Sequence, residues 1–194
     1  MLRNGPLDGR QAATYIEPVA RAVEQAHQLG ILHRDLKPQN VLVDNQTNRP
    51  YVADFGLAKL LRTDQELTQS GEVMGSPPYM SPEQALDSAR VTAASDVYSL
   101  GATLYHVLTG RPPFHAATVV DTLRQVVDDE PVPPCRLNRA IDKDLETICL
   151  KCLQKEPARR YGTARALADD LGRYLRNEPI QARAIGPLGR AMRW

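Results

Sequence analysis

The sequence predicts a mainly α-helical protein with one small β-hairpin, an α+β fold. Apolar residues recur at steps of three and four over residues 8–30 and over much of the chain after residue 95, which is the period of amphipathic helices. Two short β-like runs at 40–43 and 50–53 flank a polar cluster typical of a turn. Hydrophobic residues make up 42% of the 194 residues and charged residues 24%, which is enough apolar material for one sizeable core.

The composition also argues against several classes of protein. A formal net charge of +1 disfavours nucleic-acid binding, which usually involves a strongly basic domain. No apolar run reaches the roughly 18 residues that a membrane span needs, and residues 1–10 do not resemble a secretory signal. Three cysteines, an odd number, favour a reducing, cytoplasmic location. Cys149 and Cys152 fall on an apolar helical pattern, so we expect them in the core and not at a metal site.

The first helix is expected over residues 8–30, with Asp8 as its N-cap and Gly30 just past its end. Pro18 lies inside this pattern and lacks a backbone N–H, so we expect a kink or a break near Thr14. Residues 63–82 are rich in polar residues, glycine and proline, and we expect them to be irregular.

Further helices are expected in the second half of the chain, with Gly110 as a stop signal for the first of them. Residues 177–194 have no helical period and contain proline, glycine and arginine, so we expect a flexible basic tail there and a folded domain over 1–176. The expected helices lie at 95–109, 117–127, 142–153 and 163–175.

The segment most informative about chemistry is His33-Arg-Asp-Leu-Lys-Pro-Gln-Asn40, which is followed by Asp54-Phe-Gly56. We expect the hairpin to pair Val41 with Ala53 and to leave residues 44–50 as its loop. This register places Asn40 opposite Asp54, at the Cα separation of about 4.5–5.5 Å found between paired strands. An amide oxygen and a carboxylate at that point suit Mg²⁺, which prefers oxygen ligands and usually shares them with phosphates.

Asp35 and Lys37 lie just upstream, on the same rim. A carboxylate beside a metal–phosphate site can orient a hydroxyl group and accept its proton, and a lysine can neutralise a transferring phosphoryl group. Taken singly, each of these residues is more often a solvated loop residue. Their joint occurrence at this spacing indicates phosphoryl transfer.

With these motifs, residues 8–175 resemble the C-terminal lobe of a eukaryotic-like (bacterial) serine/threonine protein kinase. Gly75-Ser-Pro-Pro-Tyr-Met-Ser-Pro-Glu83 is similar to the loop on which these kinases dock their substrates, and Ser95-Asp-Val-Tyr-Ser-Leu-Gly101 resembles their central helix. The resemblance implies a catalytic loop at 33–40, an activation segment at 54–83, and ATP and Mg²⁺ as cofactors. It also implies transfer of the ATP γ-phosphate to Ser/Thr hydroxyls of protein substrates.

The resemblance further implies roles for individual residues. Asp35 would be the catalytic base and Lys37 would contact the γ-phosphate. The residues implied to bind magnesium or nucleotide are Asn40 and Asp54 for Mg²⁺ and Leu42 as the floor under adenine. The implied structural residues are His33 and Phe55 as internal packing residues, Gly56 and Ser76 in the activation segment, Asp96 as the anchor of the catalytic loop, and Glu83 with Arg160 as a buried pair.

Arg34, just before Asp35, has a consequence for regulation. A buried guanidinium needs an anion, and in this family a phosphorylated residue of the activation segment provides it. Thr68 and Ser70 fall where bacterial relatives are phosphorylated, so they are candidate phosphosites, and Glu72 could supply part of the charge itself.

The family also has a small N-terminal lobe with a Gly-x-Gly-x-x-Gly loop and a strand lysine. The sequence contains no such glycine motif, and its first lysine is Lys37. We therefore expect the N-lobe to be absent, and ATP binding and activity of this chain alone to be weak or lacking. An N-lobe supplied in trans and self-association are the partners that this predicts, and a full-length relative could be membrane-associated.

Two alternative functions stay open at this point. The first is a non-catalytic, kinase-like module that binds partners through its helices. The second is a small-molecule phosphotransferase with a similar His-x-Asp loop, which residues 75–83 and Asp96 disfavour because they match a peptide-docking segment. Retention of the catalytic set favours the kinase over the non-catalytic module.

Overall fold

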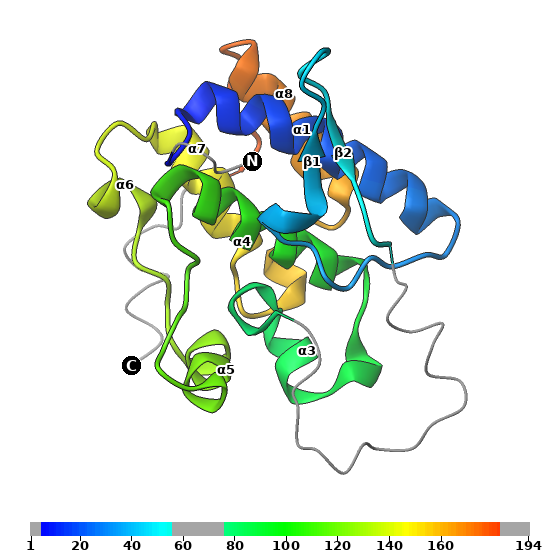
Figure 1. The fold of residues 1–194 in the computed structure, drawn as a ribbon, viewed down its shortest axis with the longest axis vertical. Coiled ribbons are helices and arrows are strands. Elements are labelled where there is room, and N and C mark those ends of the chain that lie inside the picture. Colours follow the sequence, from blue (N-terminus) through cyan, green and yellow to red (C-terminus); the bar gives the residue numbers. More distant parts are fainter. Residues whose placement is uncertain (1–4, 56–75, 183–194) are drawn as a thin grey trace.

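The computed structural model describes residues 5–55 and 76–182, which form a mostly helical structure with one two-stranded antiparallel sheet (Figure 1). The predicted fold class is therefore confirmed. No helix in these two described stretches is long and apolar enough to cross a membrane. The helices are α1 (Gly9–Gln28), α3 (Pro82–Leu86), α4 (Ala93–Thr109), α5 (Val119–Asp128), α6 (Pro134–Leu137), α7 (Lys143–Cys152) and α8 (Ala164–Leu175), and the strands are β1 (Val41–Val43) and β2 (Pro50–Val52). Short 3₁₀ turns lie at Pro38–Asn40, Pro77–Tyr79, Ser88–Arg90 and Pro157–Arg159.

Helix α4 forms the centre of the core (Figure 1). Apart from His106, its residues from Ser95 to Leu108 are all buried, and α1, α7 and α8 pack around it. A helix that is buried on nearly every side needs other elements around it, and its buried polar side chains need hydrogen-bond partners. The helix predicted at 95–109 is thus confirmed, although it begins at Ala93, and Gly110 ends it with a left-handed φ of 79°.

We expected a kink or a break near Thr14, and the break is wrong, because helix α1 runs without interruption through Pro18. Its N-cap is Asp8, as predicted, whose side chain accepts a hydrogen bond from the backbone N–H of Gln11 at 2.9 Å. The apolar face of α1 is buried against α8 and α4. Burial of a full helical face outweighs the single backbone hydrogen bond that Pro18 cannot make.

The hairpin pairs one residue out of step with the predicted register. Val41 pairs with Val52 and Val43 with Pro50, so the loop is 44–49. The backbone N–H of Asp44 donates to the carbonyl of Arg49 at 2.9 Å, which closes the loop one residue early. The Asp44 side chain also accepts hydrogen bonds inside the loop, from the backbone of residues 46 and 47. These local contacts set the register, which a strand pattern alone leaves open.

The remaining predicted helices correspond to α5, α7 and α8, while the short helices α3 and α6 were not predicted. Residues 177–182, which we expected to begin a flexible tail, are instead held against α8. The buried carboxylate of Asp170 accepts the backbone N–H groups of Gln181 at 2.6 Å and Ala182 at 2.7 Å. Residues 183–194 lie outside the described residues.

Cys149 and Cys152 are fully buried on α7, as predicted. The Cys149 thiol lies 3.6 Å from the carbonyl oxygen of Gly101 on α4. A Cβ atom at Gly101 would meet the Cβ of Cys152 at 2.3 Å, so the glycine is what allows α4 and α7 to approach this closely.

Candidate active site

A buried carboxylate holds the segment that begins at His33. Asp96, in the first turn of α4, is fully buried and accepts the backbone N–H groups of His33 and Arg34, each at 2.8 Å. Arg34 has a φ of 70°, a left-handed conformation that is uncommon for a residue with a side chain. The two hydrogen bonds that His33 and Arg34 donate to Asp96 stabilise this turn of the backbone, which directly precedes Asp35.

Lys37 is in direct contact with both Asp35 and Ser76. The Lys37 ammonium lies 2.6 Å from the Asp35 carboxylate and donates a hydrogen bond of 2.8 Å to the Ser76 hydroxyl. The three side chains are partly exposed. A proton acceptor and a cation therefore sit together beside the segment that starts at Ser76.

Asn40 is buried and turned toward the same loop. Its side-chain N–H₂ donates to the carbonyl of Asp35 at 2.8 Å, which leaves the side-chain oxygen as its remaining polar atom. In the observed register the backbone carbonyl of Asn40 accepts from Ala53, so Asn40 lies opposite Ala53 and not opposite Asp54, as we had predicted.

Asp54 follows directly after Ala53, is exposed, and has a left-handed φ of 62°. No hydrogen bond or ion pair with another described residue occupies its carboxylate. The donor set of one amide oxygen and one free carboxylate fits Mg²⁺, which binds through one or two protein ligands when phosphates supply others. No group of three His, Cys, Asp or Glu side chains within the described stretches is placed to hold a metal by itself.

His33 and Phe55 pack against each other behind this rim. Their ring centroids are 4.7 Å apart, and the His33 ring lies 2.9 Å from the carbonyl oxygen of Ala53. Leu42, on β1, is 55% exposed and pairs with Tyr51, which is equally exposed. The hairpin therefore presents two large, half-exposed side chains, Leu42 and Tyr51, that pair across the strands.

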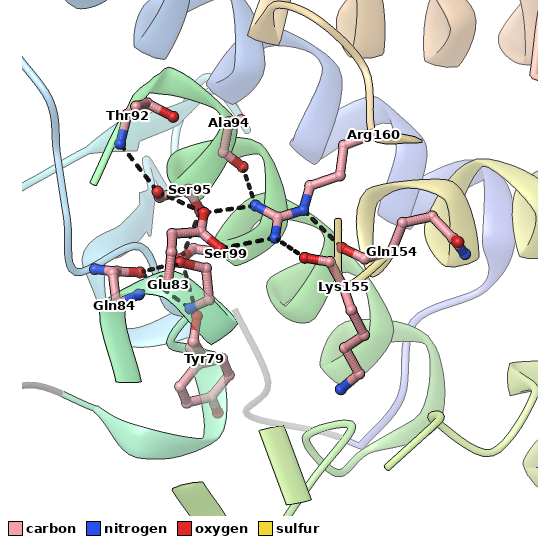
Figure 2. Close-up of polar contacts among 11 residues, drawn as sticks. Tyr79, Glu83, Gln84, Thr92, Ala94, Ser95, Ser99, Gln154, Lys155 and Arg160 are labelled. Atoms are coloured by element: carbon pink, nitrogen blue, oxygen red, sulfur yellow. Dashed lines mark hydrogen bonds and ion pairs between the residues drawn. The ribbon is translucent and has the colours of Figure 1, made fainter. Parts of the chain in front are cut away.

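Figure 2 shows a second buried charge network, centred on Arg160 and Glu83. Arg160 Nη1 and Nη2 donate to the two carboxylate oxygens of Glu83, at 2.7 and 2.8 Å, and the Ser95 hydroxyl donates to Glu83 at 2.7 Å. The rest of the guanidinium donates to carbonyl oxygens of Ala94, Gln154 and Lys155.

The ionisation of Glu83 follows from these contacts. Burial by itself raises the pKa of Glu83, but hydrogen bonds from Arg160 and Ser95 and the charge of Arg160 lower it by more, so its pKa lies below the ordinary value. The network ties α3, which carries Glu83, to the start of α4 and to the segment before α8.

The segment at 76–83 is attached to the loop at 33–40 and to α4. The Gln84 side chain donates to the carbonyl of Arg34 at 2.9 Å, and the Ser99 hydroxyl donates to the carbonyl of Tyr79 at 2.9 Å. The Tyr79 hydroxyl lies 2.5 Å from His106 Nδ1, and burial raises the pKa of Tyr79 to about 12 while it lowers the pKa of His106.

The sequence matches the protein kinase domain family over residues 1–171, which is most of its length. The chain belongs to this family.

Similar proteins include serine/threonine-protein kinase PknB from several mycobacteria. The kinase domain is 40% identical to the Mycobacterium leprae protein and 41% identical to a Mycobacterium tuberculosis protein, in each case over 179 residues that cover 92% of this chain. In both cases the match spans only 28% of the relative's length.

A solved structure, the crystal structure of Rad53 1–466 in complex with AMP-PNP, shares the fold of this kinase domain. The TM-score is 0.69 at 24% sequence identity, and the match covers 84% of this chain and 40% of that chain.

Several side-chain contacts near the site of the kinase domain were not predicted from its sequence. His27 and His106 are not among the site residues predicted from the sequence, yet each forms a hydrogen bond to a residue near the site, Asp96 and Tyr79 respectively. Gln84 was not assigned a contact at all. Their partners lie far away along the chain, so no local pattern identifies them. Gly56, Thr68 and Ser70 lie outside the described residues.

Proposed function

We propose that this chain is the C-terminal lobe of a serine/threonine protein kinase that transfers the ATP γ-phosphate to Ser/Thr hydroxyls of proteins. The observation that carries the proposal is the ion pair between Asp35 and Lys37. Asn40 donates a hydrogen bond to the backbone of Asp35, and Lys37 donates one to Ser76. The naming of the PknB relatives as serine/threonine-protein kinases and the AMP-PNP in the Rad53 structure are consistent with it.

Asp35 is the proposed catalytic base. Its carboxylate is partly exposed and pairs with Lys37, which in turn contacts Ser76 at the start of the segment proposed to dock a peptide substrate. A substrate hydroxyl next to this carboxylate would be oriented by it and would give up its proton to it as the new O–P bond forms.

Lys37 is proposed to stabilise negative charge on the phosphoryl group during transfer. Its ammonium group is held by Asp35 and Ser76, so it is already oriented before substrate binds. A preorganised cation costs little reorganisation at the moment of reaction, which is the main source of electrostatic catalysis.

Asn40 and Asp54 are the proposed ligands of Mg²⁺, and Leu42 is the proposed apolar contact of adenine. When bound, Mg²⁺ would bridge phosphate oxygens and neutralise their charge. The hydrogen bond from Asn40 to the backbone of Asp35 would keep the distance between the metal ligand and the base constant.

Regulation is proposed to act through Arg34, whose guanidinium would pair with a phosphate on Thr68 or Ser70. Phosphorylation adds charge and acceptor oxygens, and it orders loops by pairing with arginine. A mass spectrum of active protein that shows neither residue modified would contradict this part of the proposal.

Phosphoryl transfer depends on positioning from both sides of the nucleotide, so this chain alone is proposed to bind ATP weakly. The direct test joins it to the nucleotide-binding lobe of the Mycobacterium tuberculosis PknB relative and measures transfer of labelled phosphate to a general protein substrate. We expect transfer by the fusion and little or none by the chain alone.

The controls are Asp35→Asn and Lys37→Met in the same fusion. Loss of the base should lower the rate by about 10²–10⁴-fold, the range for general acid–base catalysis. Transfer that survives Asp35→Asn unchanged, or a correctly folded fusion with no transfer at all, would overturn the proposed function.

A further inference from the structure

The buried carboxylate that holds the loop at 33–40 has a third donor, which comes from a different helix. His27 Nε2, in the last turn of α1, lies 2.7 Å from Asp96 Oδ2, the oxygen that also accepts the backbone N–H of His33. The His27 side chain is only 8% exposed. α1 is thereby linked through one side chain to the loop that carries Asp35.

The chemistry of this contact fixes the tautomer of His27. An ionised carboxylate can only accept hydrogen bonds, so Nε2 must carry the hydrogen. The other ring nitrogen, Nδ1, is buried and has no hydrogen-bond partner within the described parts of the chain. Burying an unpartnered ring nitrogen costs free energy, so the contact with Asp96 must offset that cost.

The orientation of the Asp96 carboxylate affects the backbone of the loop, because its two oxygens accept hydrogen bonds from different backbone N–H groups. Oδ1 accepts from Arg34, whose φ of 70° is disfavoured, and Oδ2 accepts from His33. Rotation of the carboxylate would break both hydrogen bonds and release the left-handed turn. A donor on Oδ2 from the side of α1 opposes that rotation.

We propose that His27 is a positioning residue for the catalytic loop, which acts by fixing the orientation of the Asp96 carboxylate. The consequence for catalysis rests on the proposed function, because it assumes that residues 33–40 place the catalytic base. The effect on the loop itself does not depend on any activity.

The test compares His27→Phe, which keeps a ring without a donor, with His27→Gln, whose amide N–H₂ can still reach the carboxylate. The exposed His115 supplies the matched control, His115→Gln. Two measurements are made on the full chain by NMR: the ¹⁵N shifts of the His27 ring in the unmodified protein, and amide hydrogen exchange at His33 and Arg34.

We expect ring shifts that place a hydrogen on Nε2. We also expect exchange at His33 and Arg34 to be about tenfold faster in His27→Phe, with amides of α8 unchanged, and near the original rate in His27→Gln and His115→Gln. If His27→Phe does not fold, His27→Gln decides: retained protection supports the proposal and lost protection overturns it.

The proposal is overturned by a His27 ring protonated on Nδ1 only, or by unchanged exchange at both amides in a folded His27→Phe protein. Neither measurement uses nucleotide. A failure of the proposed kinase activity would therefore leave these results intact, and a failure here would leave the kinase assay intact.

Discussion

At the scale of single residues, two buried carboxylates are stabilised by different kinds of donor. Asp96 is surrounded by backbone N–H groups and an imidazole, whereas Glu83 faces a guanidinium and a hydroxyl. An isolated charge in the interior would be very costly, so each carboxylate depends on its full set of partners.

Glu83→Gln is expected to destabilise the protein by about 3 kcal/mol, because removal of one member of a buried ion pair leaves the other charge uncompensated. Urea unfolding measures the change. The double variant Glu83→Gln/Arg160→Met should cost less than the sum of the two single variants.

The matched control is Glu178→Gln, which breaks an exposed pair with Arg176 whose oxygen–nitrogen distance is 2.9 Å. Exposed pairs contribute little, so this variant should unfold near the unmodified protein. Equal losses for the two glutamates would show that burial of the Glu83 pair is unimportant.

His106 makes the stability depend on pH. Burial lowers its pKa in the folded state below the ordinary value of 6.5. Its contribution is therefore complete above pH 6.5 and is lost as the pH falls through the lower folded pKa, since the unfolded chain then binds more protons.

His106→Gln should remove this part of the pH dependence. Urea midpoints measured between pH 7.5 and pH 5.5 are expected to fall more steeply for the unmodified protein than for the variant, following the linkage relation. Parallel slopes for the two proteins would exclude a role for His106 in the acid loss of stability.

At the scale of elements, the close contact of α4 with α7 depends on one glycine. Gly101→Ala would place a methyl group 2.3 Å from the Cβ of Cys152, which is too short for two carbon atoms that are not bonded to each other. Because Cβ cannot rotate away, the helices must separate, and we expect a loss of about 1–3 kcal/mol or more in urea unfolding.

Two control variants show whether the loss of stability arises at the contact between residues 101 and 152. Gly162→Ala adds a methyl group where no atom lies within 4 Å, so it should be tolerated. Cys152→Gly in the Gly101→Ala background should recover part of the stability, and no recovery would mean that the loss arises elsewhere than at this contact.

At the scale of the whole molecule, Asp170 attaches the segment that follows α8 to the core. It is buried on α8 and accepts hydrogen bonds from the Tyr161 hydroxyl and from the backbone of residues 181 and 182. The side chain of Ala182 is buried as a result. The end of α8 and the segment after it are thereby joined to the core.

Asp170→Ala should release residues 177–182 and speed tryptic cleavage after Arg176. The backbone N–H groups of residues 181 and 182 would no longer have a protein acceptor and would donate to water instead. Asp169→Ala, a neighbouring exposed residue, is the control. Cleavage that is equally fast in both variants would contradict the role of Asp170.

The sequence by itself determined the fold class, the main helices and the set of residues proposed for catalysis. Helix periods, the Asp8 cap and the Gly110 stop depend on neighbours along the chain, so they can be inferred from order alone. Asp35 and Lys37 lie only two residues apart in the motif at 33–40, so their proximity can also be inferred from order alone, whereas the backbone turn before them is held by Asp96 on α4.

Only the tertiary structure decided the hairpin register, the continuity of α1 through Pro18, the attachment of residues 177–182 and the contacts of His27 and His106. Each of these balances a local preference against burial or hydrogen bonds with residues far away in the chain. Such energies depend on which elements meet in space, and a one-dimensional pattern does not contain that information.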